Sequence, residues 1–356
     1  MMKRTLPALC IAMMLLAAGC GGQTHSELIA EARGMDMTQE IPAAFTEDNY
    51  GTAAAAILES IQQNYPGRIA GSAKEKETAL FVLSVLLNGG YSEKNINVQP
   101  FSIPTAAPAI EAGEAQIFDG GEQSGTSRNI EAVIKGKSEK TIVVGAHYDS
   151  AGTHGVDDNG SGVSVALESA LRMANAEPGY TIRYVFFGAE EIGMCGSRAY
   201  VEQLSKKDKE NIVLMINIDS VLTGDYMYIY GGHINPDRKV VDTEPVMRAA
   251  EIAEESGLVI QLVPEGNEDY PYPTGQKRSD HAPFSDAGIP YVYFEANNWE
   301  TGSPIETQEH GLIMHTERDD LAFIEKKYGE RGRNTLAAYS KLLHAMLKEH
   351  DWEKFD

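Results

Sequence analysis

Residues 141–149 read TIVVGAHYD. The run before the histidine carries no charge, and such a run is typical of a strand that is buried on both faces of its sheet. Residues 181–187 and 212–218 are predicted as buried strands of the same kind. Helical patterns occupy the intervals, at 161–174 and 197–204. Buried strands that alternate with helices predict a mostly parallel sheet with helices on both faces.

The same alternation extends outward over the chain. Further helices are expected at 52–63, 74–88, 240–255 and 333–347, and further strands at 97–103, 130–134 and 289–294. Ser72 and Glu75 form a capping-box pattern, which predicts where the second of these helices begins. We therefore expect one α/β domain with three layers, α/β/α, around a mostly parallel, mixed central sheet. Residues 231–239 and 264–278 are expected to be loops, and the second could either wall a site or have no catalytic role.

The N-terminus has the character of an export signal. Lys3 and Arg4 precede an apolar stretch that is too short to span a membrane and is typical of a signal peptide. Residues 16–20 then read LAAGC. This pattern resembles the lipobox of bacterial lipoproteins, in which the cysteine carries the lipid. We therefore expect Cys20 to be lipidated, with simple secretion after cleavage near Ala18 as the alternative.

These signals divide the chain into three parts. Residues 1–19 are expected to be a signal peptide that is removed, residues 20–49 a polar tether with room for one short helical stretch, and residues 50–356 the folded domain. The expected location is the cell envelope, where the protein would be held by lipid on Cys20.

Composition limits the partners of this chain. A formal charge of −22 disfavours nucleic-acid binding, which depends on a basic surface, and disfavours contact with anionic lipid headgroups. Membrane association is therefore expected only through the lipid. Cys10 leaves with the signal and Cys20 carries lipid, so Cys195 is expected to remain as a free, packed thiol without a disulfide.

Potential metal ligands stand at the carboxyl ends of the three central strands. His147 and Asp149 follow the first strand, Glu190 and Glu191 the second, and Asp219 the third. Ligands of such sheets gather at the carboxyl ends of the strands. Buried apolar strands have no structural need for these groups, and unpaired charges there are costly. A shared cation would offset that cost.

Two more residues are ambiguous when each is read alone. Asp158 lies in residues 156–162, VDDNGSG, where an aspartate is explained best by capping of the following helix. His315 reads as a surface histidine. The order of the whole series, His, Asp, Glu-Glu, Asp, His, makes Asp158 a plausible bridging carboxylate and His315 a plausible ligand.

With these motifs in this order, the chain resembles a known family, the M28 zinc aminopeptidases, also called the aminopeptidase Y family. The resemblance runs from about Tyr50 to the C-terminus. Its marks are GRIAGS at 67–72, RNI at 128–130, GAHYDS at 145–150, DNGSG at 158–162, EEIGMCGS at 190–197, NID at 217–219, SDHAPF at 279–284 and HT at 315–316. The fold that it implies is the zinc-exopeptidase, phosphorylase/hydrolase-like type.

The resemblance implies two zinc ions that are bridged by Asp158. One ion would also bind His147 and Asp219, and the other Glu191 and His315. Nitrogen and oxygen ligands of this kind suit zinc.

The resemblance also implies roles for residues that do not bind metal. Glu190 matches the general base, which takes a proton from a zinc-activated water and passes it to the leaving amine. Asp149 matches the carboxylate that orients His147. Asp280 and His281 are expected to be supporting residues near the site.

The reaction implied is hydrolysis of peptides from the free N-terminus. A cationic α-amine would be stabilised beside the carboxylates of the site, whereas a C-terminal carboxylate would need a cation such as Lys277 or Arg278. Carboxypeptidase, dipeptide hydrolase and single-zinc glutaminyl cyclase chemistry on the same fold stay open, as does a lipoprotein that only binds peptides. The sequence does not predict the oligomeric state.

Overall fold

The computed structural model describes residues 23–35, 44–103, 125–234, 240–264, 279–301, 305–349 and 352. The expected signal peptide and Cys20 lie outside the described residues, as do Lys277, Arg278 and nearly all of the loop at 264–278. No helix within the described ranges is long and apolar enough to cross a membrane.

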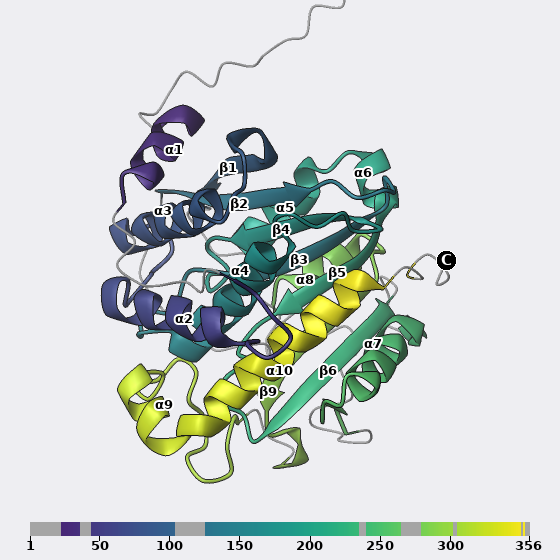
Figure 1. Ribbon diagram of the computed structural model, residues 1–356. Coiled ribbons are helices and arrows are strands. Elements are labelled where there is room, and N and C mark those ends of the chain that lie inside the picture. The colour runs from purple at the N-terminus through teal and green to yellow at the C-terminus, as the bar shows by residue number, and fades with distance from the viewer. Residues whose placement is uncertain are drawn as a thin grey trace, which may run out of the picture.

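A mixed sheet forms the centre of the domain (Figure 1). Its strand order is β1-β2-β4-β3-β5-β9-β6-β7, and β8 pairs with β6. The described strands are β1 (Ile96–Ile103), β2 (Gly125–Ile134), β3 (Thr141–His147), β4 (Thr181–Phe187), β5 (Ile212–Ile218), β6 (Tyr226–Ile234), β7 (Val240–Asp242), β8 (Gln261–Leu262) and β9 (Tyr291–Asn297). The four central strands β4, β3, β5 and β9 are parallel, whereas β1, β2 and β6 pair antiparallel at the sides.

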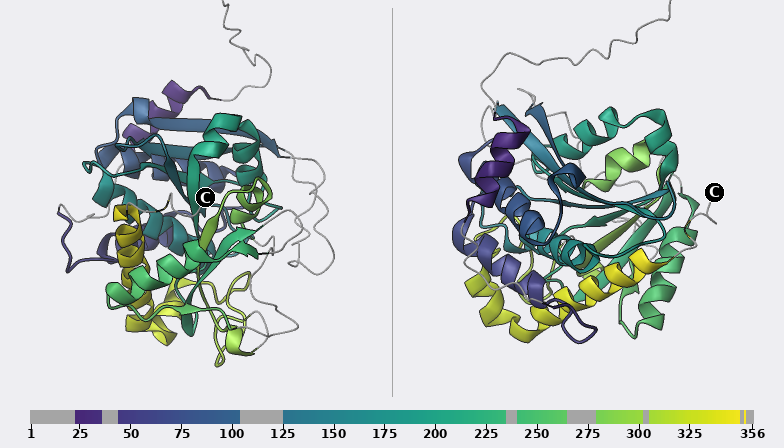
Figure 2. Two further views of the ribbon diagram at one scale, coloured as in Figure 1. Left: turned by 90° about the vertical axis from the view of Figure 1, so that its right-hand side faces the viewer. Right: turned by 45° about the horizontal axis from the view of Figure 1, so that its top comes forward.

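Helices cover both faces of this sheet, as the two turned views show (Figure 2). One face packs against α2 (Thr52–Asn64), α3 (Ala73–Asn88), α4 (Gly162–Met173), α7 (Glu244–Glu255) and α10 (Gly329–Lys348). The other face packs against α5 (Cys195–Gln203) and α8 (His281–Asp286). The shorter helices α6 (Lys206–Asn211) and α9 (Leu321–Lys327) lie beside these layers. The predicted three-layer α/β/α fold is confirmed.

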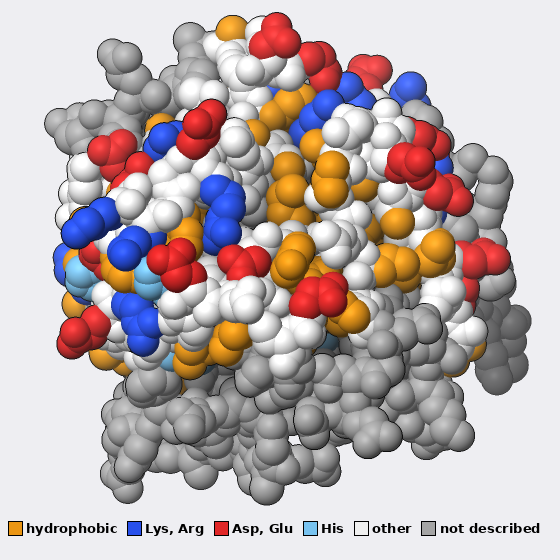
Figure 3. All heavy atoms as spheres, turned by 90° about the horizontal axis from the view of Figure 1, so that it is seen from below, with side chains coloured by type: hydrophobic (Ala, Val, Ile, Leu, Met, Phe, Trp, Pro, Cys, Tyr) orange, Lys and Arg blue, Asp and Glu red, His pale blue; other side chains and the backbone are white. Residues whose placement is uncertain are grey.

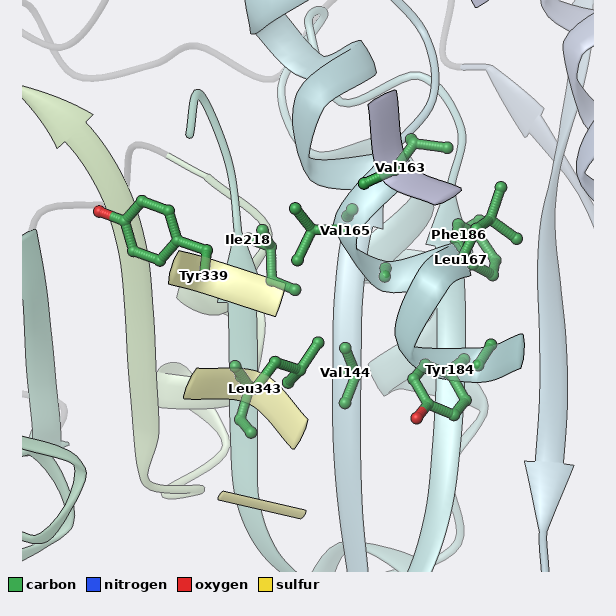
Figure 4. Packing of buried hydrophobic residues seen from close by; sticks show 14 of the residues in the cluster. Val144, Val163, Val165, Leu167, Tyr184, Phe186, Ile218, Tyr339 and Leu343 are labelled. Carbon is green, nitrogen blue, oxygen red and sulfur yellow. The ribbon is translucent and has the colours of Figure 1, made fainter. Parts of the chain in front are cut away.

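The larger core lies between the central strands and the helices α4 and α10. Figure 4 shows Val144 of β3, Ile218 of β5, and Val165 of α4 directed into this layer, with Leu343 of α10 beside them. Each of these side chains is buried. A smaller core lies on the other face of the sheet. Because successive residues of β3 point to opposite faces, Val143 packs in this smaller core. This double burial explains why the strand reads as an uninterrupted apolar run.

Two segments differ from expectation in how they are used. The short helical stretch in the expected tether is α1 (His25–Arg33); Thr24 caps it, and it packs into the main core through Leu28 and Ile29, so ordered structure begins before residue 50. Strand β6 continues into the loop expected at 231–239. Its Gly231 is needed there because a Cβ would lie 2.3 Å from the carbonyl oxygen of Tyr291 on β9. This glycine marks the close approach of two strands.

The surface does not gather its excess negative charge into one patch on the face seen from below (Figure 3). Acidic, basic and apolar side chains are interspersed there. What positions the functional site is the sheet: β3, β4 and β5 are adjacent and parallel, so their carboxyl ends meet at one edge.

Candidate metal centre

The carboxyl edge of the central sheet brings together the five residues that the sequence predicted as ligands. His147 ends β3, and Asp219 follows β5 directly. Glu191 lies in the turn after β4, Asp158 in the irregular helical segment η2 (Val156–Ser161) before α4, and His315 in the loop before α9. Their potential ligand atoms form two groups, each within 4.8 Å.

The first group consists of His147, Asp158 and Asp219. The Nε2 atom of His147 lies 3.2 Å from Oδ1 of Asp158 and 3.5 Å from Oδ1 of Asp219. All three side chains are buried. One imidazole nitrogen and two carboxylate oxygens therefore converge on one point.

The second group consists of Asp158, Glu191 and His315. Here Nε2 of His315 lies 2.9 Å from Oδ2 of Asp158 and 2.9 Å from Oε2 of Glu191. Asp158 thus directs one oxygen to each group, which is the geometry of a bridging ligand.

The residues present fit a divalent metal. The donors are nitrogen and oxygen atoms of the types that zinc binds. Oε1 of Glu191 is buried and has no hydrogen-bond partner among the described residues, and a buried carboxylate oxygen without a partner is costly. Three carboxylates at such short range need positive charge between them.

In the chain alone, protons on the histidines supply part of that positive charge. Although burial lowers it, the carboxylates of Glu191 and Asp158 raise the pKa of His315 to about 12. Burial also lowers the pKa of His147, but the nearby carboxylates of Asp219, Asp149 and Asp158 raise it by more. The pKa of His147 therefore stands well above its usual range. Burial and the neighbouring Asp158 raise the pKa of Glu191 to about 7.

Asp149 fixes the turn that follows β4. Its Oδ1 accepts the backbone N–H of Glu190 at 2.9 Å, and its Oδ2 accepts that of Glu191 at 3.1 Å. The predicted contact with the imidazole is looser, because Nδ1 of His147 lies 3.5 Å from Oδ1 of Asp149. Asp149 therefore acts on the Glu190–Glu191 turn at least as directly as on His147.

Two further buried carboxylates, which sequence reasoning missed, hold the other ligand loops. Asp319 accepts the backbone N–H of Asp157 at 2.6 Å and that of Asp158 at 3.2 Å. Glu306 accepts the N–H of Ile313 at 2.5 Å and that of Met314 at 3.2 Å, directly before His315. Both acids lie outside helices and strands. In such segments the sequence has no periodic pattern that would show whether an acidic side chain is buried or exposed to solvent.

Arg68 supplies a buried cation beneath the centre. Its side chain is 1% exposed and donates to the carbonyl oxygens of Tyr148 at 2.7 Å, His154 at 2.8 Å and Gly155 at 2.7 Å. Each of these carbonyls belongs to the segment between His147 and Asp158. The GRIAGS motif thus has a physical role: its arginine shapes the loop that joins two ligands.

The segment at 279–284 supports the same edge. Ser279 accepts a hydrogen bond from the side-chain amide of Asn217 at 2.8 Å, and His281 stacks on Tyr291 with ring centres 4.4 Å apart. Asp280 is fully buried, and burial raises its pKa to about 7.

Tyr293 of β9 donates to Oδ2 of Asp219 at 3.1 Å. Cys195 is a buried free cysteine.

Left-handed backbone concentrates around the ligands. Ala189, Ser220 and His315 have φ angles of 55°, 53° and 57°, respectively. Non-glycine residues adopt this conformation rarely, and such strain clusters at functional sites. The surrounding structure thus holds these loops in backbone conformations that are unfavourable for isolated residues.

The chain matches the model of "Peptidase family M28" over residues 129–340. Among curated proteins, it is 28% identical over 280 residues to the alkaline phosphatase isozyme conversion protein of Escherichia coli K12, covering 74% of this chain and 77% of that one. It is 33% identical over 208 residues to aminopeptidase YwaD of Bacillus subtilis, covering 57% of this chain and 41% of that one. A further match, 34% over 176 residues, is the probable lipoprotein aminopeptidase LpqL of Mycobacterium tuberculosis, covering 47% and 34%.

Solved structures show the same fold at low sequence identity. A zinc aminopeptidase from Bacillus subtilis, BSAP, superposes with a TM-score of 0.65 at 21% identity, covering 87% of this chain and 97% of that one. A glutaminyl cyclase from an Acidobacteriales bacterium superposes with a TM-score of 0.61 at 18% identity, covering 87% and 98%. The fold alone therefore does not separate these two chemistries. The family match spans more than half of the chain, and the prediction from its motifs is confirmed: the protein belongs to peptidase family M28.

Proposed function

We propose that this protein is a two-zinc aminopeptidase that releases N-terminal residues from peptides, with Glu190 as the general base. The observation that carries the proposal is the sharing of Asp158. Its Oδ1 belongs to the group with His147 and Asp219, and its Oδ2 to the group with Glu191 and His315. A single ion would leave one of these groups of nitrogen and oxygen ligands without a metal.

The metal ions and the protein side chains would have separate roles in the reaction. Two close zinc ions supply an activated water and polarise the scissile carbonyl. His147 and Asp219 would hold one ion, Glu191 and His315 the other, and Asp158 both. The imidazole and carboxylate geometry is preset by the loops described above, so little reorganisation is needed when substrate arrives.

Glu190 is suited to move a proton. Its backbone is fixed by Asp149, while its neighbour Glu191 belongs to the second ligand group. Burial raises the pKa of Glu190 well above its usual range; His147 opposes this, and Asp280, Glu191 and Asp219 add to it. That shift refers to the chain without metal. Zinc ions beside Glu190 would favour its ionised form, which can take a proton from water and pass it to the departing amine.

The charge of the site favours a free amine as the recognised end of the peptide. The three ligand carboxylates would offset most of the charge of two zinc ions, and Glu190 and the buried Asp280 place further carboxyl groups at the same edge of the sheet. A cationic α-amine is stabilised there, whereas a terminal carboxylate is repelled unless a cation faces it. Similarity to aminopeptidase YwaD and to a zinc aminopeptidase structure supports the same choice.

The second candidate is a single-zinc glutaminyl cyclase. It is favoured only by the likeness of fold to the Acidobacteriales enzyme. Five nitrogen and oxygen ligands in two groups support two ions instead. The metal count distinguishes the two candidates, and a peptide-binding protein without catalysis would show no turnover with either class of substrate.

We also propose that the mature protein is a lipoprotein anchored through Cys20. Residues 16–20 resemble a lipobox, and the relative LpqL is described as a probable lipoprotein aminopeptidase. The acidic chain would gain nothing from anionic headgroups, so attachment would depend on the acyl chains.

Substitution of the two adjacent glutamates should have different effects. Glu190→Gln should retain two zinc ions per chain and lose about 10²–10⁴-fold in kcat, because only proton transfer is removed. Glu191→Gln should lower zinc content after dialysis, because a ligand is lost. Metal analysis and steady-state kinetics on both variants test this. Wild-type protein that saturates at one zinc ion, or near-normal rates in both variants, would contradict the assignment.

Zinc binding should release protons. The pKa values of His315, about 12, and Glu191, about 7, are raised in the metal-free chain, so both groups hold protons that the metal must displace. Apparent zinc affinity should therefore rise as pH rises through about 7 and fall on acidification. Calorimetric titration of the apo-protein in two buffers of different ionisation enthalpy counts the protons. An affinity that is constant or stronger in acid speaks against this ligand set.

Blocking each end of one peptide should identify the end that is read. Hydrolysis of the free, N-acetylated and C-amidated forms is followed by mass spectrometry. Acetylation should stop cleavage, because it removes the α-amine charge, and amidation should not. The reverse pattern indicates a carboxypeptidase, and cleavage of all three forms indicates an endopeptidase.

The lipid anchor can be tested by fractionation. The native protein should sediment with membranes and partition into detergent, whereas Cys20→Ser should do neither, because several acyl chains are needed for stable anchoring. Mature soluble protein that begins at another residue would instead establish simple secretion.

A further inference from the structure

We propose that Glu75 is a positioning residue for Glu190: from the start of α3 it holds the backbone of Ala189 in the turn that presents the base. This inference rests on the proposed role of Glu190. Glu75 lies outside residues 129–340, over which the family model matches. The sequence predicted for it only a local role in capping α3.

The contacts of Glu75 are made with three separate segments. Its carboxylate is 2% exposed. Oε1 accepts the hydroxyl of Ser127 at 2.5 Å and the backbone N–H of Ala189 at 3.1 Å, and Oε2 accepts the backbone N–H of Gly71 at 2.7 Å. One side chain thus joins the chain before α3, the strand β2 and the turn after β4.

The helix itself does not need this carboxylate. Ser72 caps α3 by accepting the backbone N–H of Glu75 at 3.1 Å. In a capping box, the glutamate side chain would return to the N–H of the capping residue. Here the N–H of Ser72 instead donates to the carbonyl of Ile69, and Glu75 turns away toward Ala189. Its place in the first turn can favour the helix through the dipole, but its hydrogen bonds are made outside the cap, to Gly71, Ser127 and Ala189.

The turn that Glu75 contacts is held through every one of its first four backbone amides. The N–H of Gly188 donates to Asn129 at 3.3 Å, that of Ala189 to Glu75, and those of Glu190 and Glu191 to Asp149. Each acceptor is a side chain from another part of the chain. The carbonyl oxygens of Ala189 and Glu190 accept backbone N–H groups from the following residues, whereas these four N–H groups find only side-chain acceptors. The orientation of the four amides therefore depends on those acceptors.

Ala189 is the residue of this turn that most needs support. Its φ of 55° is unusual for a residue with a Cβ. The preceding Gly188 lets the backbone pass close to Glu75, since a Cβ there would lie 2.9 Å from Oε1 of Glu75 and 2.3 Å from Oγ of Ser127. If the Ala189 amide lost its acceptor, Asp149 would still hold the amide of Glu190, but the strained peptide before it would lose a support and Glu190 would shift relative to the ligands.

The test is Glu75→Gln in the zinc-loaded enzyme. The amide keeps the size but offers one acceptor oxygen instead of two, so kcat on the N-terminally free peptide should fall about 10–100-fold, the effect expected of a small misplacement of a catalytic group. KM and zinc content should stay close to wild type. The apparent pKa of the base in the kcat–pH profile should also shift, which a loss of stability alone would not cause.

Glu168→Gln is the matched control. Glu168 of α4 is a fully buried carboxylate that accepts the backbone N–H groups of Gly51 at 2.9 Å and Ala54 at 2.8 Å, at the start of α2. Because Glu168 also pairs with the buried Arg172 at 2.9 Å, its substitution should lower the melting temperature at least as much as Glu75→Gln, and it should leave kcat and the pH profile unchanged. Should Glu75→Gln not fold, Ser127→Ala removes one donor to Glu75 and should lower kcat several-fold without loss of zinc.

A double variant separates this inference from the proposed function. If Glu75 acts through Glu190, adding Glu75→Gln to Glu190→Gln should lower kcat little further, because residues that act as a unit are not additive. Multiplicative losses, or a Glu75→Gln enzyme within about twofold of wild-type kcat, would overturn the positioning role. A Glu190→Gln enzyme with full activity would instead overturn the proposed function.

Discussion

Hydrogen bonds from backbone amides to buried carboxylates hold the functional edge of this protein together. Asp149 accepts two amides of the turn after β4, Asp319 two amides of the segment before α4, and Glu306 two amides before His315. Loops at this edge have no partner strand to satisfy their amides, and a carboxylate with several donors tolerates burial. The same bonds therefore solve a structural problem and fix the ligands that the loops carry.

This solution has an electrostatic cost. Acids that support loops and acids that bind metal share one low-dielectric region, where like charges repel strongly. Burial raises the pKa of Glu306 and of Glu75 to about 8. Arg68 is a buried cation in the same region. Divalent metal at the two ligand groups would remove much of this repulsion, so metal binding and stability are expected to be coupled.

The sequence was informative where a regular element ended in a polar residue. His147, Glu191 and Asp219 could be predicted because an apolar strand ends at each of them or within a few residues before it, and parallel strands bring such ends together. Asp319 and Glu306 gave no such signal, since a loop acid that accepts amides looks like a solvated one. Glu75 was misread for a different reason: its spacing from Ser72 satisfied a local pattern, whereas its side chain makes long-range contacts.

The position of α1 has a consequence for how an anchored enzyme would meet its substrates. The helix is capped by Thr24 and packs into the main core, so it is part of the folded body. If Cys20 carries lipid, only the four steps to Thr24 separate anchor from body, about 14 Å of fully extended chain. The working distance from the bilayer would then be set by the size of the domain, and peptides beyond the envelope surface would have to diffuse to it.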